Sequence, residues 1–323
     1  MSVTFLSAAQ QTELIELRHL SGSDLRPLLW EEAEAWREML DWDFTPSADL
    51  VMKFVDLRSL SGFAALVNGR IAGYAYFLSE DRKGLIGDVY VRKEHRTFTR
   101  ENSLLQAVME ELANVCAVRR VESQLMMLDS PLSRPMVFEA HMREFRRTFM
   151  AWEPGFWGHG ASRAEDILLF ETWREERLEE SAQMIALAYR DHIDSQINDQ
   201  YQSVSGARRF LSNIIQFPGC GRFFAPASCL AFRKDTGLPC GLILGSLVNE
   251  GVGHITQICV TPESRGLGIG YELLRRALRE FGAAGCRKVS LTVTSSNTSA
   301  IRLYERMGFR RVHEFGAHVW AGF

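Results

Sequence analysis

The stretch Val260-Thr-Pro-Glu-Ser-Arg265-Gly-Leu-Gly-Ile-Gly270-Tyr-Glu-Leu-Leu274 decides the fold of the second half of this chain. An apolar strand pattern ends at Val260, glycines occupy alternate positions after Arg265, and a helical pattern begins directly after them. Glycine permits tight turns and close ligand approach, and the first N–H groups of a helix lack partners and lie at its positive end. This segment therefore suits a pyrophosphate, to which Arg265 adds a fixed positive charge.

The spacing of the glycines excludes two other phosphate-binding patterns. A dinucleotide fingerprint, G-x-G-x-x-G, needs a glycine where Tyr271 stands if it starts at Gly266, or where Leu273 stands if it starts at Gly268. The G-x-x-x-x-G-K-[ST] pattern is absent from the sequence. On its own, the segment also fits a sharp strand-to-helix connection that binds nothing.

Composition places the chain among ordinary globular proteins. Its 323 residues, 46% of them hydrophobic and 24% charged, suggest two domains. A formal net charge of -3 gives no overall attraction for nucleic acid or an anionic membrane surface, and no stretch has the length of a membrane span. The N-terminus lacks a signal-peptide pattern, and the 6 cysteines show no C-x-x-C pairs, so we expect a cytoplasmic protein with reduced thiols and no metal site.

The chain contains an internal repeat. Apolar positions of the segment 86–112 recur in the segment 255–281 through a strand, a charged loop position and a helix, and Arg96 falls on Arg265, 169 positions later. Agreement across successive elements indicates two copies of one fold rather than one large sheet. We expect a first domain over residues 1–153, a linker over 154–165 and a second domain over 166–323.

Each copy shows the same coarse order of elements. A strand and an amphipathic helix come first, two alternating strands follow, and the repeated strand and helix come next. A last strand, a helix and a terminal strand pair complete the copy. This order is typical of a mixed, mostly antiparallel sheet flanked by helices, so we expect an α/β (α+β) fold. The clearest elements of the second copy are strands over 228–233, 240–248 and 288–294 and a helix over 298–307.

Two motifs of the second copy resemble one family. Arg265-Gly-Leu-Gly-Ile-Gly270 resembles [RQ]-x-x-G-x-[GA], the acyl-CoA-binding signature of the GNAT superfamily of N-acyltransferases. Val293-Thr-Ser-Ser-Asn297-Thr-Ser-Ala300-Ile-Arg-Leu-Tyr304-Glu-Arg-Met-Gly308-Phe309 resembles the family's strand, its N-x-x-A-x-x-x-Y helix and its closing Gly-Phe. The resemblance covers the second domain and, in weakened form, the first. It implies tandem GNAT-like domains, of which the second moves an acetyl group from acetyl-CoA to an amine.

The resemblance also implies which residues hold acetyl-CoA. Main-chain groups of Ile258 and Val260 would bind the pantetheine arm and the thioester, and the glycines would hold the pyrophosphate. Asn297 would contact the CoA, while its other interpretation is that of an N-cap for the following helix. Cys259 has the opposite strand parity and is expected in the core. The full expected set is Ile258, Cys259, Val260, Arg265, Gly266, Leu267, Gly268, Ile269, Gly270, Asn297, Ala300 and Tyr304.

In this family the amine attacks the thioester directly, so no Ser or Cys nucleophile is needed. The site must take a proton from the amine and give one to the departing thiolate. Tyr304 is the expected acid, with a core aromatic residue as the alternative interpretation. His254 is the expected base because histidine titrates near neutral pH. Glu250 is the rival base, and a strand histidine that is hydrogen-bonded at an edge is the alternative.

The acceptor site is expected after the first helix of the second domain. We predict that Asp191, His192, Asp194, Asn198 and Tyr201 lie there, where carboxylates would attract a cationic amine. A solvated polar loop is the alternative. The expected acceptor is a small-molecule or peptide amine, with no nucleic acid or membrane partner, and the chain is expected to be a monomer or homodimer.

The first copy has lost the residues of the proposed site. Arg96 is kept, but a glycine turn is not, and a carboxylate replaces the last glycine, where it would repel a pyrophosphate. The replacements are Thr97, Thr99 and Glu101 for the glycines, Leu85 for His254 and Ala140 for Tyr304. We therefore expect a degenerate first domain. Two alternatives stay open for the whole chain, namely a non-catalytic acyl-CoA-binding or regulatory protein and a transferase of longer acyl groups.

Overall fold

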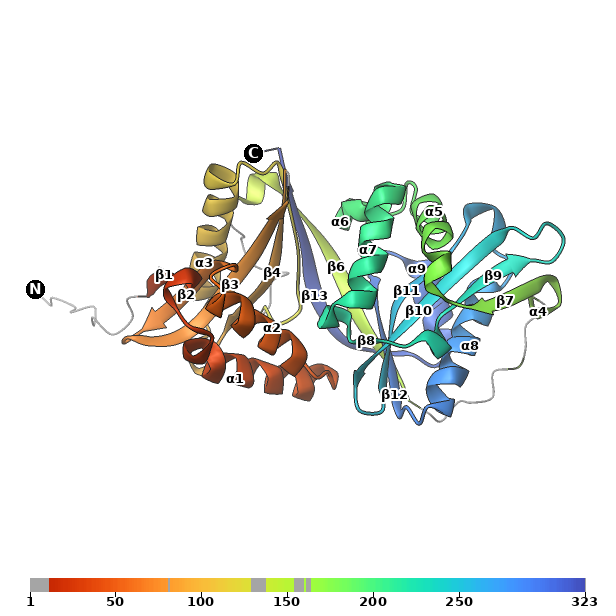
Figure 1. Cartoon of the computed structure of the whole chain (residues 1–323), viewed down its shortest axis with the longest axis horizontal. Coiled ribbons are helices and arrows are strands. Elements are labelled where there is room, and N and C mark those ends of the chain that lie inside the picture. The colour runs from red at the N-terminus through yellow and green to blue at the C-terminus, as the bar shows by residue number, and fades with distance from the viewer. Residues whose placement is uncertain (1–11, 81, 129–137, 154–159, 161–163, 323) are drawn as a thin grey trace, which may run out of the picture. The chain divides into compact units, whose positions relative to one another are not determined.

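The computed structural model describes residues 12–80, 82–128, 138–153, 160 and 164–322 and divides into two compact units (Figure 1). None of the helices in these ranges is long and apolar enough to cross a membrane. Unit 1 comprises Met1–Glu38, Phe44–Glu144 and Phe315–Phe323, and unit 2 comprises Met39–Asp43 and Phe145–Glu314.

Unit 1 is a mixed sheet flanked by helices. Its strands pair antiparallel in the order β1, β2, β3 and β4, then β4 pairs parallel with β5, and β5 pairs antiparallel with the C-terminal part of β13. The elements are β1 (Glu13–Glu16), α1 (Gly22–Leu40), α2 (Thr45–Asp56), β2 (Ser61–Val67), β3 (Arg70–Glu80), β4 (Lys83–Val91), α3 (Phe98–Glu110), β5 (Arg120–Leu125) and β13 (Arg310–Ala321), with short 3-10 or π segments at Leu17–His19, Lys93–His95, Glu111–Val115 and Glu139–His141.

Unit 2 repeats this plan. Strands β7, β9, β10 and β11 pair antiparallel, β11 pairs parallel with β12, and β12 pairs antiparallel with β6. The elements are β6 (Met142–Trp152), α4 (Ala164–Ile167), β7 (Leu168–Thr172), α5 (Leu178–Ala188), α6 (Asp194–Ile197), α7 (Val204–Gln216), β8 (Arg222–Phe223), β9 (Cys229–Arg233), β10 (Pro239–Asn249), β11 (Val252–Val260), α8 (Ile269–Ala283), β12 (Lys288–Thr294) and α9 (Thr298–Arg306), with 3-10 turns at Glu175–Arg177, Asp199–Gln202, Pro218–Cys220, Ala225–Ala227 and Pro262–Ser264.

The predicted fold class is confirmed, since each unit is a mixed, mostly antiparallel sheet flanked by helices. The last strand of each sheet, however, comes from an unexpected part of the chain. Unit 2 is completed by β6, which ends the first sequence copy, and unit 1 by the end of β13. The predicted boundaries at 1–153, 154–165 and 166–323 describe the sequence repeat and stay a prediction, and residues 154–159 and 161–163 lie outside the described ranges.

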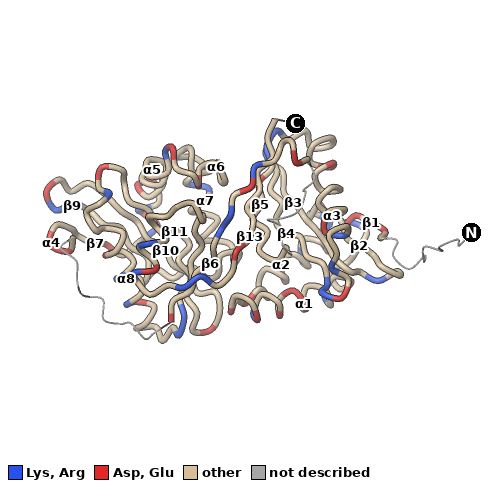
Figure 2. Tube along the Cα trace, turned by 180° about the vertical axis from the view of Figure 1, so that it is seen from behind, with Lys and Arg blue, Asp and Glu red and all other residues tan. Residues whose placement is uncertain are grey.

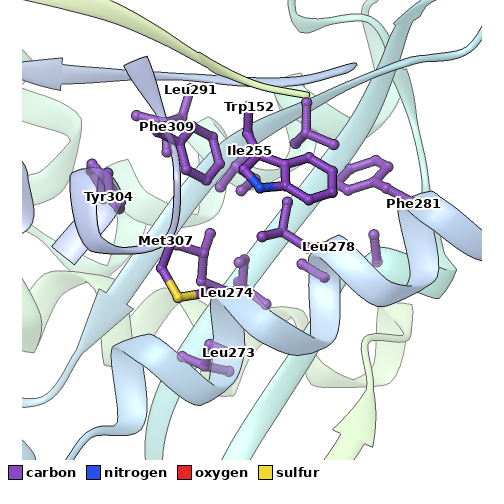
Figure 3. Packing of buried hydrophobic residues seen from close by; sticks show 14 of the residues in the cluster. Trp152, Ile255, Leu273, Leu274, Leu278, Phe281, Leu291, Tyr304, Met307 and Phe309 are labelled. Atoms are coloured by element: carbon purple, nitrogen blue, oxygen red, sulfur yellow. The ribbon is translucent and has the colours of Figure 1, made fainter. Parts of the chain in front are cut away.

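Helix α8 covers one face of the unit 2 sheet (Figure 3). Its buried positions include Leu273, Leu274, Leu278 and Phe281, which pack with residues of β6, β11, β12 and the α9 region in one apolar cluster. Their 3,4-residue spacing is the helical periodicity on which the repeat was recognised. Helices α5 and α7 cover the opposite face, where they share a second cluster with β9, β10 and β11.

Unit 1 contains a pair of buried carboxyl groups. Glu32 of α1 is fully buried and accepts hydrogen bonds from the Tyr74 hydroxyl (2.9 Å) and the Trp36 indole (3.3 Å). Asp88 of β4 is also buried and is hydrogen-bonded to Glu32, so one of the two carboxyls holds a proton. Burial raises the pKa of both groups, and the charge of Asp88 raises that of Glu32 further.

A raised carboxyl pKa makes the stability of unit 1 depend on pH. Above the ordinary carboxyl pKa of about 4.5, the folded state holds more protons than the unfolded chain, so the free energy of unfolding falls as pH rises. In Glu32→Gln the amide donates to Asp88 without a titrating proton, so we expect a shallower fall between about pH 5 and 8 in urea unfolding. Glu34→Gln, at an exposed position of α1, is the control and should keep the wild-type slope. Equal slopes for Glu32→Gln and wild type would contradict the shared proton.

Candidate functional site

Strands β11 and β12 run parallel but pair only near their beginnings. Their register joins Val252–Ile255 to Lys288–Leu291, whereas the strands continue to Val260 and Thr294. The pairing with β12 ends at a bulge in β11. The bulge is seen in the pairing with β10, where Ile255 and Gln257 lie opposite adjacent β10 residues and Thr256 between them has no paired residue. Within the described ranges no other strand pairs with this edge of β11, so main-chain groups at its end lack a strand partner.

The glycine turn lies directly beyond this opening. Gly266 and Gly268 have φ values of 80° and 81°, a region that strongly favours glycine, and Gly268 is the N-cap of α8 with no side-chain cap. A Cβ added at Gly266 would meet no heavy atom within 4 Å. The turn is exposed, and the first N–H groups of a 15-residue helix stand behind it. These features fit a bound pyrophosphate.

A carboxylate in the first turn of α8 is neutralised within the helix. Basic and acidic residues occur together along α8 (Figure 2). Glu272 is buried and accepts from Arg275 Nε at 3.1 Å, and Arg276 Nε lies 3.2 Å from its carboxylate. Paired in this way, Glu272 does not cancel the positive end of the helix.

Arg265 and the remaining residues of the predicted CoA set surround this turn. Arg265 Nη2 donates to the main-chain oxygen of Ala188 at 2.7 Å, so the guanidinium is bonded to the C-terminal end of α5, and its expected contact with CoA stays a prediction. Leu267 is exposed, whereas Cys259 is buried as expected, and its burial raises the thiol pKa to about 12. Ile269 is buried, and Ile258, Val260 and Ala300 are partly buried against the same apolar cluster.

Helix α9 brings Asn297 and Tyr304 to the opening. Asn297 Oδ1 accepts from the Ala300 N–H at 3.2 Å, which confirms the N-cap interpretation, and its Nδ2 lies 3.3 Å from His192 Nε2. Tyr304 is buried. Burial raises its phenol pKa, the charge of Asp194 raises it further, and that of Arg147 lowers it. Tyr304 is therefore protonated at neutral pH, as an acid must be.

The predicted acceptor segment divides into two groups. His192, Asp194 and Tyr201 are partly buried and lie together: the rings of His192 and Tyr201 both contact Tyr189, and His192 Nδ1 lies 3.9 Å from the Asp194 carboxylate. The charge of Asp194 raises the pKa of Tyr201 and of Tyr304. The carboxylate of Asp194 accepts from the Thr294 hydroxyl and from Arg147, so it is already paired. Asn198 belongs with these residues, because its side chain is hydrogen-bonded to Tyr201 and its Oδ1 also accepts from the Gln200 N–H at 3.0 Å. The second group is Asp191 alone, which is exposed with a φ of 61°.

The sequence did not identify Tyr189 or Arg147. The Tyr189 hydroxyl donates to Gln257 Oε1 (3.2 Å) and lies 3.4 Å from the Ile258 carbonyl, at the open edge of β11, and its ring stacks on Tyr201 with centroids 4.5 Å apart. In the sequence it is only the last residue of the predicted helix that precedes the acceptor segment. Arg147 belongs to the first sequence copy, so nothing in the sequence assigned it to unit 2.

The two predicted bases lie away from the open end of β11. His254 Nδ1 is 2.9 Å from Ser290 Oγ, and its buried ring contacts Trp42 and Phe149 at centroid distances of 4.9 and 6.0 Å. Burial lowers its pKa to about 3. Glu250 is exposed in the turn before β11, which at ~3.3 Å per residue is about 30 Å from Val260. The burial of the His254 ring weakens its case as the base, and the distance of Glu250 from the end of β11 weakens the case for Glu250. Both roles stay predictions.

Unit 1 keeps the opening but fills it. Strands β4 and β5 pair only from Lys83–Ile86 to Arg120–Ser123. Arg96 Nε and Nη2 donate to the Val91 carbonyl at 3.2 and 3.1 Å, at the position that matches Val260. The hydroxyl of Thr97 caps α3 by accepting from the Arg100 N–H at 3.3 Å. In unit 1, the side chains of Arg96 and Thr97 thus bond main-chain groups at the end of the strand and the start of the helix, the positions that match the opening of unit 2.

Comparison with known proteins identifies the family. Residues 188–309 match the model of the acetyltransferase (GNAT) family, and this part of the chain belongs to that family. The GCN5-related N-acetyltransferase of Sphaerobacter thermophilus is similar over 96% of this chain and 95% of its own, with a TM-score of 0.68 and 20% identity. A tandem GNAT protein from the clavulanic acid biosynthesis pathway is similar over 96% of this chain and 98% of its own, with a TM-score of 0.62 and 17% identity. The predicted tandem GNAT fold is thus confirmed.

Curated relatives match shorter stretches. An uncharacterized N-acetyltransferase of Methanocaldococcus jannaschii is 42% identical over 84 residues, 26% of this chain and 53% of the relative. The mycothiol acetyltransferase of Saccharopolyspora erythraea is 39% identical over 89 residues, which are 28% of this chain and 29% of the relative. The N-alpha-acetyltransferase MAK3 of Arabidopsis thaliana is 41% identical over 59 residues, which are 18% of this chain and 31% of the relative. The chain thus spans about half the length of the first and less than a third of the other two.

The glycine turn generates a paired prediction. Gly268→Glu forces a side chain into a positive-φ position and sets a negative charge beside the pyrophosphate, so calorimetry should show acetyl-CoA affinity reduced about 30-fold or more. Thr99→Glu, at the matching exposed position of unit 1, is the control and should leave affinity unchanged. The assignment fails if Gly268→Glu binds normally or if Thr99→Glu weakens binding equally.

Proposed function

We propose that unit 2 transfers an acetyl group from acetyl-CoA to an amine. The separation of β11 and β12 beside the N-terminus of α8 carries this proposal. It supports a long ligand whose acyl end lies between the strands while its pyrophosphate meets the helix. The family match over 188–309 supports the same substrate. Acetyl-CoA supplies the activated acetyl thioester, and the chain binds and orients it and moves protons.

The reaction needs three tasks from the protein. Main-chain groups at Ile258 and Val260 hold the thioester arm, and the N–H groups at Gly268–Gly270 hold the pyrophosphate. The amine nitrogen bonds to the thioester carbonyl carbon, the C–S bond breaks, and Tyr304 gives its proton to the sulfur. The positive charge of Arg147, which lowers the phenol pKa, favours this loss of a proton.

His254 and Glu250 remain the proposed bases that take the proton of the amine. His254 precedes Ile255, the last residue of β11 that pairs with β12, and its buried ring contacts Trp42 and Phe149. The acceptor is proposed to be a small-molecule or peptide amine, as in the relatives named for such reactions. We further propose that the protein is a cytoplasmic monomer or homodimer.

Tyr304→Phe tests the proposed acid. Loss of the phenol proton should lower kcat for thiol release about 100-fold or more, while acetyl-CoA affinity measured by calorimetry stays the same. Tyr90→Phe, a buried tyrosine of unit 1, is the matched control and should retain both. Full turnover in Tyr304→Phe would remove Tyr304 from the mechanism, and absence of thiol release with every amine in the wild type would favour a protein that only binds acyl-CoA.

His254→Asn tests the proposed base. Asn keeps a polar atom for Ser290 but does not titrate, so a base role predicts at least about 100-fold lower kcat. The ring is neutral above about pH 3, so the wild-type rate should show no acidic limb from this group between pH 5 and 8. Retained turnover with a lower unfolding temperature would assign His254 to the core instead. Glu250→Gln is assayed in parallel, and a comparable loss of kcat in that variant would make Glu250 the base.

A further inference from the structure

Arg147 uses only one side of its guanidinium group within unit 2. It lies on β6 directly opposite Thr294 of β12, and 12% of its side chain is exposed. Its Nη1 donates to Thr294 Oγ1 at 2.8 Å and to Asp194 Oδ1 at 3.3 Å. Its Nε is buried and has no hydrogen-bond partner, and no described residue bonds Nη2.

The unused side of this group has a defined shape. Nη1 lies on the Cδ side of the planar guanidinium, so Nε–H and Nη2 point together from the other edge. Two parallel N–H donors in this arrangement match the two oxygens of a carboxylate or phosphate. A buried charged donor without a partner is costly, so the arrangement favours a ligand that supplies such oxygens.

Other unpaired polar atoms lie on the same face of the sheet. Thr292, two residues before Thr294 on β12, therefore points the same way, and its buried hydroxyl has no partner in the described residues. Gln257 gives its Oε1 to Tyr189, while its Nε2 is buried and unpaired. These atoms and the fork of Arg147 thus leave several unsatisfied hydrogen-bonding groups on this face of the sheet.

This ligand would lie beside the proposed chemistry. Asp194, which accepts from Arg147, lies 3.9 Å from His192, and the charge of Arg147 lowers the pKa of both His192 and Tyr304, so both groups are within electrostatic reach of Arg147. The pyrophosphate of acetyl-CoA is assigned to the other end of its site, at the start of α8. The fork of Arg147 is thus available to the second substrate.

We propose that the acceptor is an amine that also carries a carboxylate or phosphate group, and that the Nε–Nη2 fork of Arg147 binds this group. This inference rests on the proposed function of unit 2. Arg147 acts as a specificity residue: it positions the acceptor nitrogen by holding its anionic end. Asp194 and Thr294 keep the guanidinium in place through Nη1.

The experiment compares amines that differ only in the anionic group. The full chain and acetyl-CoA are assayed for thiol release with amino acids against their amides, and with phosphoethanolamine against ethanolamine. We expect kcat/KM for the best anionic amine to exceed that of its neutral partner at least 100-fold, and Arg147→Gln to remove this preference with acetyl-CoA affinity unchanged. Which pair shows the preference separates carboxylate from phosphate.

Control variants and a binding measurement complete the test. Arg146→Gln, at the adjacent exposed position of β6, should retain the preference, and Arg147→Lys should restore only part of it. With [15N]arginine, the Nε–H signal absent from Arg147→Gln should shift on adding the anionic amines and not the neutral ones. Equal kcat/KM within the pairs, or an equal loss for both members in Arg147→Gln, would overturn the inference. If no amine is acetylated, the proposed function fails, and the Arg147 signal alone decides the inference by shifting or by remaining fixed.

Discussion

The site depends on the point at which β11 and β12 stop pairing. Parallel strands normally satisfy each other's main-chain groups along their length, and here the bulge of β11 ends this after Ile255. The glycine turn follows β11, and α9 with Tyr304 follows β12, so the groups proposed to hold the pyrophosphate and to protonate the thiolate flank the resulting gap. Unit 1 has the same gap, but there Arg96 bonds the Val91 carbonyl and Thr97 caps the helix. We therefore expect a substrate site to need both separated strands and main-chain groups that are not already bonded to nearby side chains.

The final strand of the first sequence copy gives unit 2 residues that the second copy does not encode. β6 ends the first sequence copy, yet its residues from Phe145 onward pair with β12 and belong to unit 2. Through this arrangement Arg147 reaches Asp194 and Thr294. The first copy, which lacks the glycine turn, therefore contributes to unit 2 the residue that we propose binds the acceptor. This gives a physical reason for both copies to be kept in one chain.

The sequence predicted what depends on local pattern and missed what depends on distant packing. Helical periodicity identified the buried face of α8, strand and helix limits in unit 2 matched within a few residues, and Asn297 caps α9 as its position before Ala300 indicated. His254 has a suitable residue type, but its enclosure depends on Trp42, more than two hundred positions earlier in the chain, and on a strand of the other copy. Tyr189 stood out only as the end of a predicted helix, because its contact with Ile258 appears only when α5 packs on β11.

Hydrogen–deuterium exchange of the intact protein with and without acetyl-CoA tests the central claim most directly, because it reports on both units in one sample. The account predicts slower exchange in peptides that cover residues 256–270 and 298–306, which flank the opening of unit 2, and no change in the matching segment 87–101 of unit 1. Slowing in 87–101, or no slowing in 256–270 at saturating acetyl-CoA, would contradict it.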